Sequence, residues 1–186
     1  MEKIKFYCIL FCLVVLSACK NKTEKIESKK TVEQEVVESK IQNQYTVKVT
    51  LKSDVSDRFQ FVFVSKDKEE TVVKVNVVKS DDYQTIEGGV IVDFEEEFPD
   101  VAYFGLGYFN LKKVSIKEVE LSYKGKSKIF SSAEFNEFFD INKYMIKGAI
   151  EGEYTTNKID NRLVPIFNIK KAAINSVKED SVKLNE

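Results

Sequence analysis

From residue 44 onward, apolar and polar residues alternate along most of the chain. In the first such segment the apolar residues Tyr45, Val47, Val49 and Leu51 are separated by single polar ones. A period of two is typical of a β-strand that buries one face. Alternating segments and short apolar runs together predict strands at residues 45–51, 59–64, 71–78, 84–94, 101–110, 114–123, 126–130, 144–154 and 163–169.

The spacing of these segments predicts the fold class. A strand begins roughly every 10 to 15 residues, with short polar turns and no long helical pattern between. This organisation favours an all-β fold, an antiparallel β-sandwich of jelly-roll-like layout, over an α/β fold. The buried phase slips by one position within residues 114–123, which predicts a β-bulge at residues 117–118. Pro165 predicts that the last strand lies at an edge of its sheet.

One short helix is expected to interrupt the strands. Ser131 and Glu134 have the spacing of a capping box, which marks a helix start. Three phenylalanines then follow at helical spacing and share one face: Phe135, Phe138 and Phe139. We expect this helix to end at residues 140–142 and its apolar face to close one open end of the sandwich. Otherwise the three rings would form an exposed apolar patch.

The N-terminus has the three parts of a secretory signal. Two lysines precede an apolar run at residues 6–16, and small residues follow it. The run is too short for a spanning helix, which needs about 20 apolar residues. Its end, Leu16-Ser17-Ala18-Cys19, resembles the lipobox of bacterial lipoproteins at all four positions. The resemblance implies cleavage before Cys19, a diacylglycerol on its sulfur and a fatty acid on the new N-terminus. The alternative is an ordinary signal peptide with a chance cysteine.

The chain therefore divides into four parts. They are a signal peptide at 1–18, the lipidated Cys19 with a charged tether at 19–43, the β-sandwich domain at 44–177 and a flexible tail at 178–186. The tether alternates lysine and glutamate and lacks glycine, proline and aromatic residues, which favours a solvated spacer over a partner-binding helix.

The residues after Cys19 indicate which membrane, and which face of it, holds the protein. Surface-exported lipoproteins of Bacteroidota carry an acidic motif there, whereas residues 20–24 read Lys-Asn-Lys-Thr-Glu. Lys20 also differs from the Asp that retains enterobacterial lipoproteins in the inner membrane. We expect an outer-membrane lipoprotein on the periplasmic face, held to the membrane through the lipid on Cys19.

The amino-acid composition limits the reactions that the chain could catalyse. The chain has no His and only three cysteines, of which Cys8 and Cys12 leave with the signal and Cys19 carries lipid. Imidazole and thiol catalysis are then absent, and we expect no enzymatic activity, no cofactor and no metal site. Lys and Arg total 29 against 30 acids, which gives no reason to expect a nucleic-acid partner. The acids near Pro99, Asp93, Glu95 and Asp100, suit either a calcium loop or a solvated turn.

The segment 103–109 is the candidate binding site. If it is a strand, Tyr103, Gly105, Gly107 and Phe109 share one face. Two glycines between aromatic rings would make a flat floor for a sugar ring. The alternative is that the glycines mark a bulge or make room for a bulky neighbour. The absence of Trp, the usual stacking residue of sugar-binding modules, counts against the sugar.

A second resemblance supports a binding role. The order of a Val- and Phe-rich sheet followed by Phe135-x-x-Phe138-Phe139-x-Ile141-Asn142 is similar to β-sandwich domains of unknown function in Bacteroidota lipoproteins. Their layout resembles that of jelly-roll carbohydrate-binding modules. Such relatives carry an Arg-x-Asp step where this chain has Phe104 to Gly107, so the resemblance carries no ligand role to that step.

Three functions follow as hypotheses. The first is a membrane-anchored, non-catalytic β-sandwich that binds a glycan. The second is a structural or assembly lipoprotein that docks envelope proteins. The third is a hydrolase with two carboxylates, which needs a pair about 5 to 9.5 Å apart in a cleft.

Overall fold

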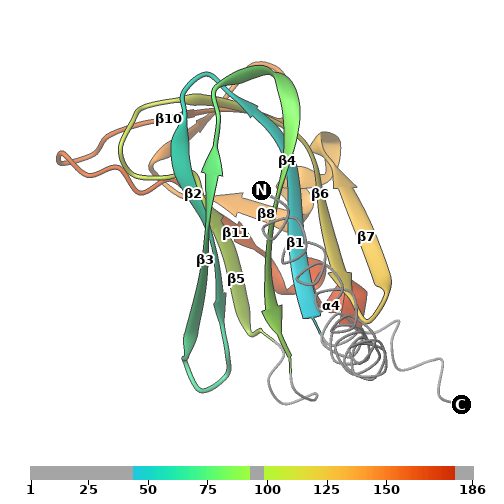
Figure 1. Ribbon diagram of the computed structural model, residues 1–186. Helices are drawn as coiled ribbons and strands as arrows, with labels where there is room; N and C mark the ends of the chain where they lie inside the picture. Colours follow the sequence, from blue (N-terminus) through green and yellow to red (C-terminus); the bar gives the residue numbers. More distant parts are fainter. Residues whose placement is uncertain (1–43, 93–98, 179–186) are drawn as a thin grey trace, which may run out of the picture. The chain divides into compact units, whose positions relative to one another are not determined.

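The computed structural model describes residues 44–92 and 99–178, and these form two antiparallel sheets (Figure 1). The first sheet has the order β4-β1-β6-β10-β9, and β7 also pairs with β6. Its strands are β1 (Gln44–Ser53), β4 (Ser80–Ile91), β6 (Lys113–Tyr123), β7 (Lys126–Ser131), β9 (Met145–Lys147) and β10 (Glu153–Thr156). The second sheet has the order β3-β2-β5-β11-β8. Its strands are β2 (Asp57–Val64), β3 (Glu70–Val77), β5 (Val101–Gly105), β8 (Phe139–Ile141) and β11 (Ile166–Ile169). The predicted all-β sandwich is confirmed.

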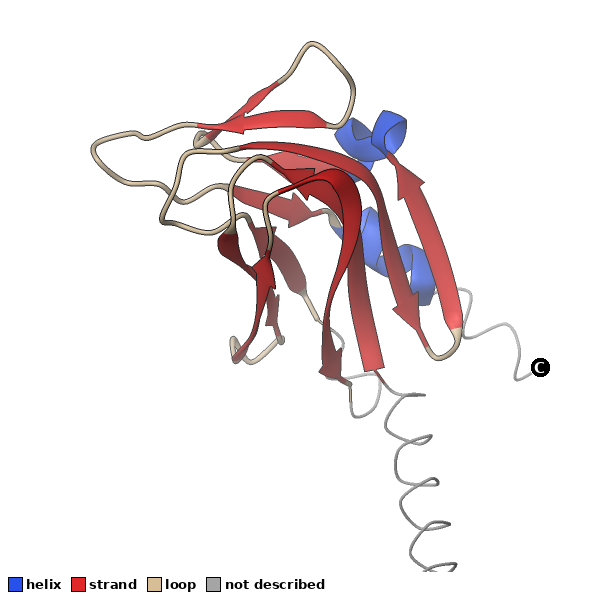
Figure 2. Cartoon of the chain, turned by 45° about the horizontal axis from the view of Figure 1, so that its top comes forward, coloured by secondary structure: helices blue, strands red, loops and turns tan. Residues whose placement is uncertain are grey.

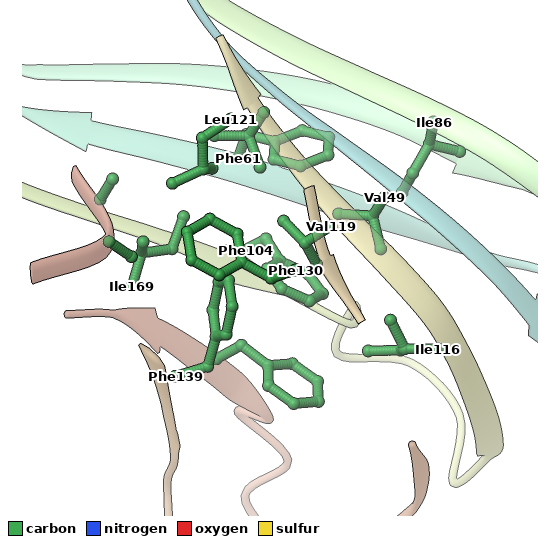
Figure 3. Packing of buried hydrophobic residues seen from close by; sticks show 14 of the residues in the cluster. Val49, Phe61, Ile86, Phe104, Ile116, Val119, Leu121, Phe130, Phe139 and Ile169 are labelled. Carbon is green, nitrogen blue, oxygen red and sulfur yellow. The ribbon is translucent and has the colours of Figure 1, made fainter. Parts of the chain in front are cut away.

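The two sheets bury a core rich in phenylalanine (Figure 3). The alternation along β1 places Tyr45, Val47, Val49 and Leu51 inward with no exposed surface. In the second sheet the rings of Phe104 and Phe167 stack with centroids 4.6 Å apart. Such ring pairs contribute about 0.5–1.5 kcal/mol beyond the burial of their area.

The predicted β-bulge is confirmed. Across the β1–β6 pair, Thr50 lies opposite Glu118 and Leu51 lies opposite Ile116, so Lys117 is the extra residue. The extra residue shifts the phase of the strand, and both Ile116 and Val119 are consequently buried.

The predicted capping box is also confirmed. The backbone N–H and the hydroxyl of Ser131 donate to Glu134 Oε2 at 2.9 and 2.8 Å. The helical segment, η2 (Ser132–Glu134) and α3 (Phe135–Phe138), ends earlier than expected because Phe139 already belongs to β8. Its rings still enter the core between the sheets, where Phe135 contacts Phe167 at a centroid distance of 6.5 Å.

Other predictions were wrong in detail. The strand expected at 101–110 ends at Gly105, and the one expected at 144–154 is divided into β9 and β10. The last strand, β11, lies between β5 and β8 and not at an edge. Pro165 is compatible with this interior place because it precedes the strand, where no ladder N–H is needed, and its carbonyl accepts from Leu106 N at 3.0 Å.

A second helix was not predicted. Helix α4 (Lys171–Lys178) packs against β6 and β7, and Figure 2 shows it beside these strands. Ala173, Ile174 and Val177 are its buried residues, at the spacing of one helical face. The helix therefore belongs to the core of the domain and extends to Lys178, where the sequence predicted the start of the tail.

Candidate functional site

The candidate site lies on the outer face of the second sheet, where β5 ends. Along β5 the side chains of Ala102 and Phe104 point into the core, so Tyr103 and Gly105 face outward. The prediction placed Gly107 and Phe109 on this face as well. Because the strand stops at Gly105, these two residues lie in the loop 106–112 instead. The structure therefore brings together only Tyr103 and Gly105 of the four predicted residues.

A residue outside the four predicted ones, Tyr108, completes the site. Tyr108 returns from the loop toward the sheet, and its hydroxyl accepts a hydrogen bond from the Gln60 side-chain amide. Gln60 is the register partner of Gly105 across the β2–β5 pair. A Cβ on Gly105 would lie 3.3 Å from Gln60 Cγ, so the missing side chain leaves room for this amide.

We call this surface the tyrosine face and define it by Gln60, Val62, Tyr103, Gly105 and Tyr108. Val62 lies directly opposite Tyr103 in the β2–β5 register and is only 1% exposed, although the alternation of β2 points it away from the core. Tyr108 is 40% exposed. The face thus offers two phenol rings with their hydroxyl groups and one amide, a mixture of apolar and polar groups like that of small-ligand sites, whereas Val62 and Gly105 are themselves buried.

The two phenol groups are electrostatically close. Partial burial raises the pKa of the Tyr103 phenol above its usual value, and nearby Glu70 adds to the rise. Partial burial also raises the pKa of Tyr108, with a further contribution from Tyr103. Both groups are therefore neutral at physiological pH and can act as hydrogen-bond donors as well as acceptors.

A buried ion pair holds the loop that carries Tyr108. Lys112 Nζ lies 2.6 Å from Asp57 Oδ2, and neither side chain has exposed surface. The same ammonium donates to the carbonyl of Leu106 at 2.7 Å and sits 5.7 Å from the centroid of the Phe59 ring. Burial lowers the pKa of Lys112, and the hydrogen bond to Asp57 opposes that effect. Because Lys112 reaches back to Leu106, the pair ties the two ends of the loop together.

Gly107 allows this arrangement. Its φ of +83° is in the left-handed region, and a Cβ at this position would lie 2.6 Å from Asp57 Cγ. A larger residue would meet both backbone strain and a clash with the ion pair. The alternative interpretation of this glycine, that it makes room for a neighbour, is therefore the one that the geometry supports.

The loop also exposes two apolar side chains. Phe109 is 74% exposed and Leu111 is 51% exposed. Strand β1 runs from Gln44 to Ser53, and Asp54 then donates to the carbonyl of Lys113, next to the loop. The loop therefore lies at the end of the sandwich opposite Gln44, about 30 Å away at 3.3 Å per strand residue (Figure 1).

The acidic clusters give no metal site in the described residues. Asp93 and Glu95 of the calcium alternative lie outside them, and Asp100 forms an ion pair with Lys171 at 2.8 Å. Within residues 44–92 and 99–178, no three potential ligands among His, Cys, Asp and Glu are grouped to hold a metal ion. A shallow hollow at the end of the first sheet includes Asp54 and Glu153, but Lys113 binds both, through its backbone N–H and its ammonium.

Comparison with known proteins assigns no relatives: no protein-family model matches the chain, and neither does any curated protein. No helix in the described part of the chain has the length and apolar character needed to cross a membrane.

Proposed function

We propose that the chain is a lipid-anchored envelope protein whose β-sandwich binds a glycan without catalysis. One observation carries the proposal: Tyr103 and Tyr108 converge at Gly105, with the Gln60 amide between the strand and the loop. Tyrosine rings offer apolar area to the C–H face of a sugar, and hydroxyl and amide groups bond its hydroxyls. The tyrosine face offers both at one place.

The test is retention of the full chain in gels that contain a polysaccharide. The panel is laminarin, arabinoxylan, galactomannan, polygalacturonate and alginate. We expect at least one of them to slow migration, and removal of the two tyrosine rings to abolish the effect. Retention that is unchanged without the rings, or no retention by any member, would contradict the proposal.

The anchor is proposed from Leu16-Ser17-Ala18-Cys19. Two or three acyl chains bind a bilayer far more strongly than one, since each buried methylene contributes about 0.8 kcal/mol.

Replacing Cys19 tests the anchor. Cys19→Ser removes the acceptor sulfur, so we expect loss of palmitate labelling and at least a tenfold fall in the membrane-bound fraction of the protein. The matched control is Cys12→Ser, which changes a cysteine inside the signal and should leave labelling intact. Equal labelling of the two variants would exclude Cys19 as the lipidated residue.

A second function, docking of an envelope protein, is favoured by one feature. The loop 106–112 exposes Phe109 and Leu111 at its tip. Exposed apolar residues on a loop suit a protein partner better than a sugar. This function predicts that a partner covers the loop tip and leaves the tyrosine face open.

A further inference from the structure

Two unpaired cations border the tyrosine face. Inward Phe59 and Phe61 fix the phase of β2, so Arg58 points outward on the same side as Gln60. Lys74 lies opposite Gln60 across the β2–β3 pair. Both side chains are exposed, and neither forms a hydrogen bond or an ion pair within the described residues.

Two acids near this face already have a cation as partner. Asp57 is buried and bound by Lys112, and Asp140 of β8 is paired with Lys170 at 3.2 Å. Glu70 acts on Tyr103 at the other end of the face, four residues from Lys74 along β3, and has no ion pair within the described residues. The end of the face near Gln60 and Tyr108 therefore carries two positive charges and no unpaired acid among the described residues.

The spacing suits one ligand that contacts the cations and the rings together. Residues two apart on a strand are about 6.6 Å apart, and direct cross-strand neighbours are about 5 Å apart. Arg58 is thus two residues from Gln60 on the same face of β2, and Lys74 is the direct neighbour of Gln60 on β3. The amide of Gln60 in turn bonds Tyr108. An Arg guanidinium binds a carboxylate through two parallel hydrogen bonds, and a Lys ammonium adds a point charge.

We infer that the glycan bound by the tyrosine face is anionic, a polysaccharide with uronic acid carboxylates. The inference rests on the proposed glycan binding and adds the class of sugar. Its ring would lie against Tyr103 and Tyr108, and its carboxylate would reach Arg58 and Lys74. The chain as a whole has a net charge of −1, so attraction of a polyanion depends on local cations and not on the overall charge.

The experiment compares one polymer backbone with and without its charge. The full chain is run in gels that contain polygalacturonate or fully methyl-esterified polygalacturonate, and alginate serves as a second uronate. We expect binding to both uronates, at least tenfold weaker binding to the ester, and weaker binding as salt increases.

The variant that tests the cations is Arg58→Gln/Lys74→Gln, which should lose at least tenfold in affinity for the uronates. The control is Lys48→Gln/Lys52→Gln, which removes two positive charges from β1 of the other sheet and should bind as the parent does. Equal binding of acid and ester, with no effect of Arg58→Gln/Lys74→Gln, would overturn this inference. If the ester or a neutral polysaccharide still binds through Tyr103 and Tyr108, the proposed function stands. Failure to bind either uronate would overturn the inference by itself, and the neutral members of the panel would decide the proposed function separately.

Discussion

Lys112→Met should destabilise the protein by about 3 to 5 kcal/mol, the usual cost of leaving a buried charge without its partner. Asp57 has no exposed side-chain surface, and its only cation in the described structure is Lys112 at 2.6 Å. The Leu106 carbonyl loses a donor in the same step. The measurement is the free energy of unfolding of the full chain in urea, followed by far-ultraviolet circular dichroism because the chain has no Trp.

The adjacent lysine provides the control. Lys113 pairs with Glu153 at 3.0 Å, but its side chain is 54% exposed, so Lys113→Met should cost less than about 1 kcal/mol. Asp57→Asn/Lys112→Met removes both charges and keeps an oxygen for the backbone N–H of Arg58, and it should recover at least half of the loss. Similar unfolding free energies for Lys112→Met and Lys113→Met would show that the buried pair does not hold the loop.

Tyr103→Ala/Tyr108→Ala should weaken glycan binding by about a hundredfold. A sugar that covers about 60 Å² of each ring gains about 1.5 kcal/mol per ring at 25 cal/mol per Å². That energy corresponds to about tenfold in affinity for each tyrosine. Affinity is measured from gel retardation at a series of concentrations of the polysaccharide that retains the parent most strongly.

The control for this pair is a second pair of tyrosines elsewhere. Tyr83 is 49% exposed on β4 of the other sheet, and Tyr144 precedes β9. Tyr83→Ala/Tyr144→Ala should leave affinity within about twofold of the parent, which is about 0.4 kcal/mol. Tyr103→Phe/Tyr108→Phe keeps the rings and removes the hydroxyls, so it should lose less than the alanine pair. Equal losses in the two alanine pairs would show that the tyrosine face is not the site.

The fold was predictable where a strand is long and alternates, as β1 does. In β1, a shift by one residue would move every apolar side chain to solvent, so the pattern specifies both the strand and its buried face. The bulge at Lys117 was predictable for the same reason, since it is visible as a change of phase. The capping box of Ser131 and Glu134 is local chemistry and needs no knowledge of the tertiary structure.

The parts that were not predicted depend on contacts between distant residues. Residues 101–109 contain no charged residue or strong polar break, but β5 ends at Gly105 because Lys112 reaches Asp57 and Leu106 and closes a loop. No local pattern marks a lysine that finds its partner 55 residues away. The two glycines and Asn110 are the local signal for an end of the strand, because such residues favour turns.

The tyrosine face likewise combines residues that the local sequence pattern predicted with residues that distant contacts bring together. Tyr103 and Gly105 were predicted because β5 is regular where they lie. Tyr108 was not among the predicted residues, since a strand continued to residue 110 would place it on the face of Phe104. Gln60 was not predicted, because its place beside Gly105 follows only from the β2–β5 register.

Hydroxyl-radical footprinting of the full chain tests most directly whether the tyrosine face is the binding surface. The chain is labelled with and without the panel polysaccharide that retains it most strongly, and the modified peptides are quantified by mass spectrometry. The account predicts that labelling of Tyr103 and Tyr108 falls at least threefold and that labelling of Tyr83 does not change. Unchanged labelling of both tyrosines, or protection confined to Phe109 and Leu111, would contradict it.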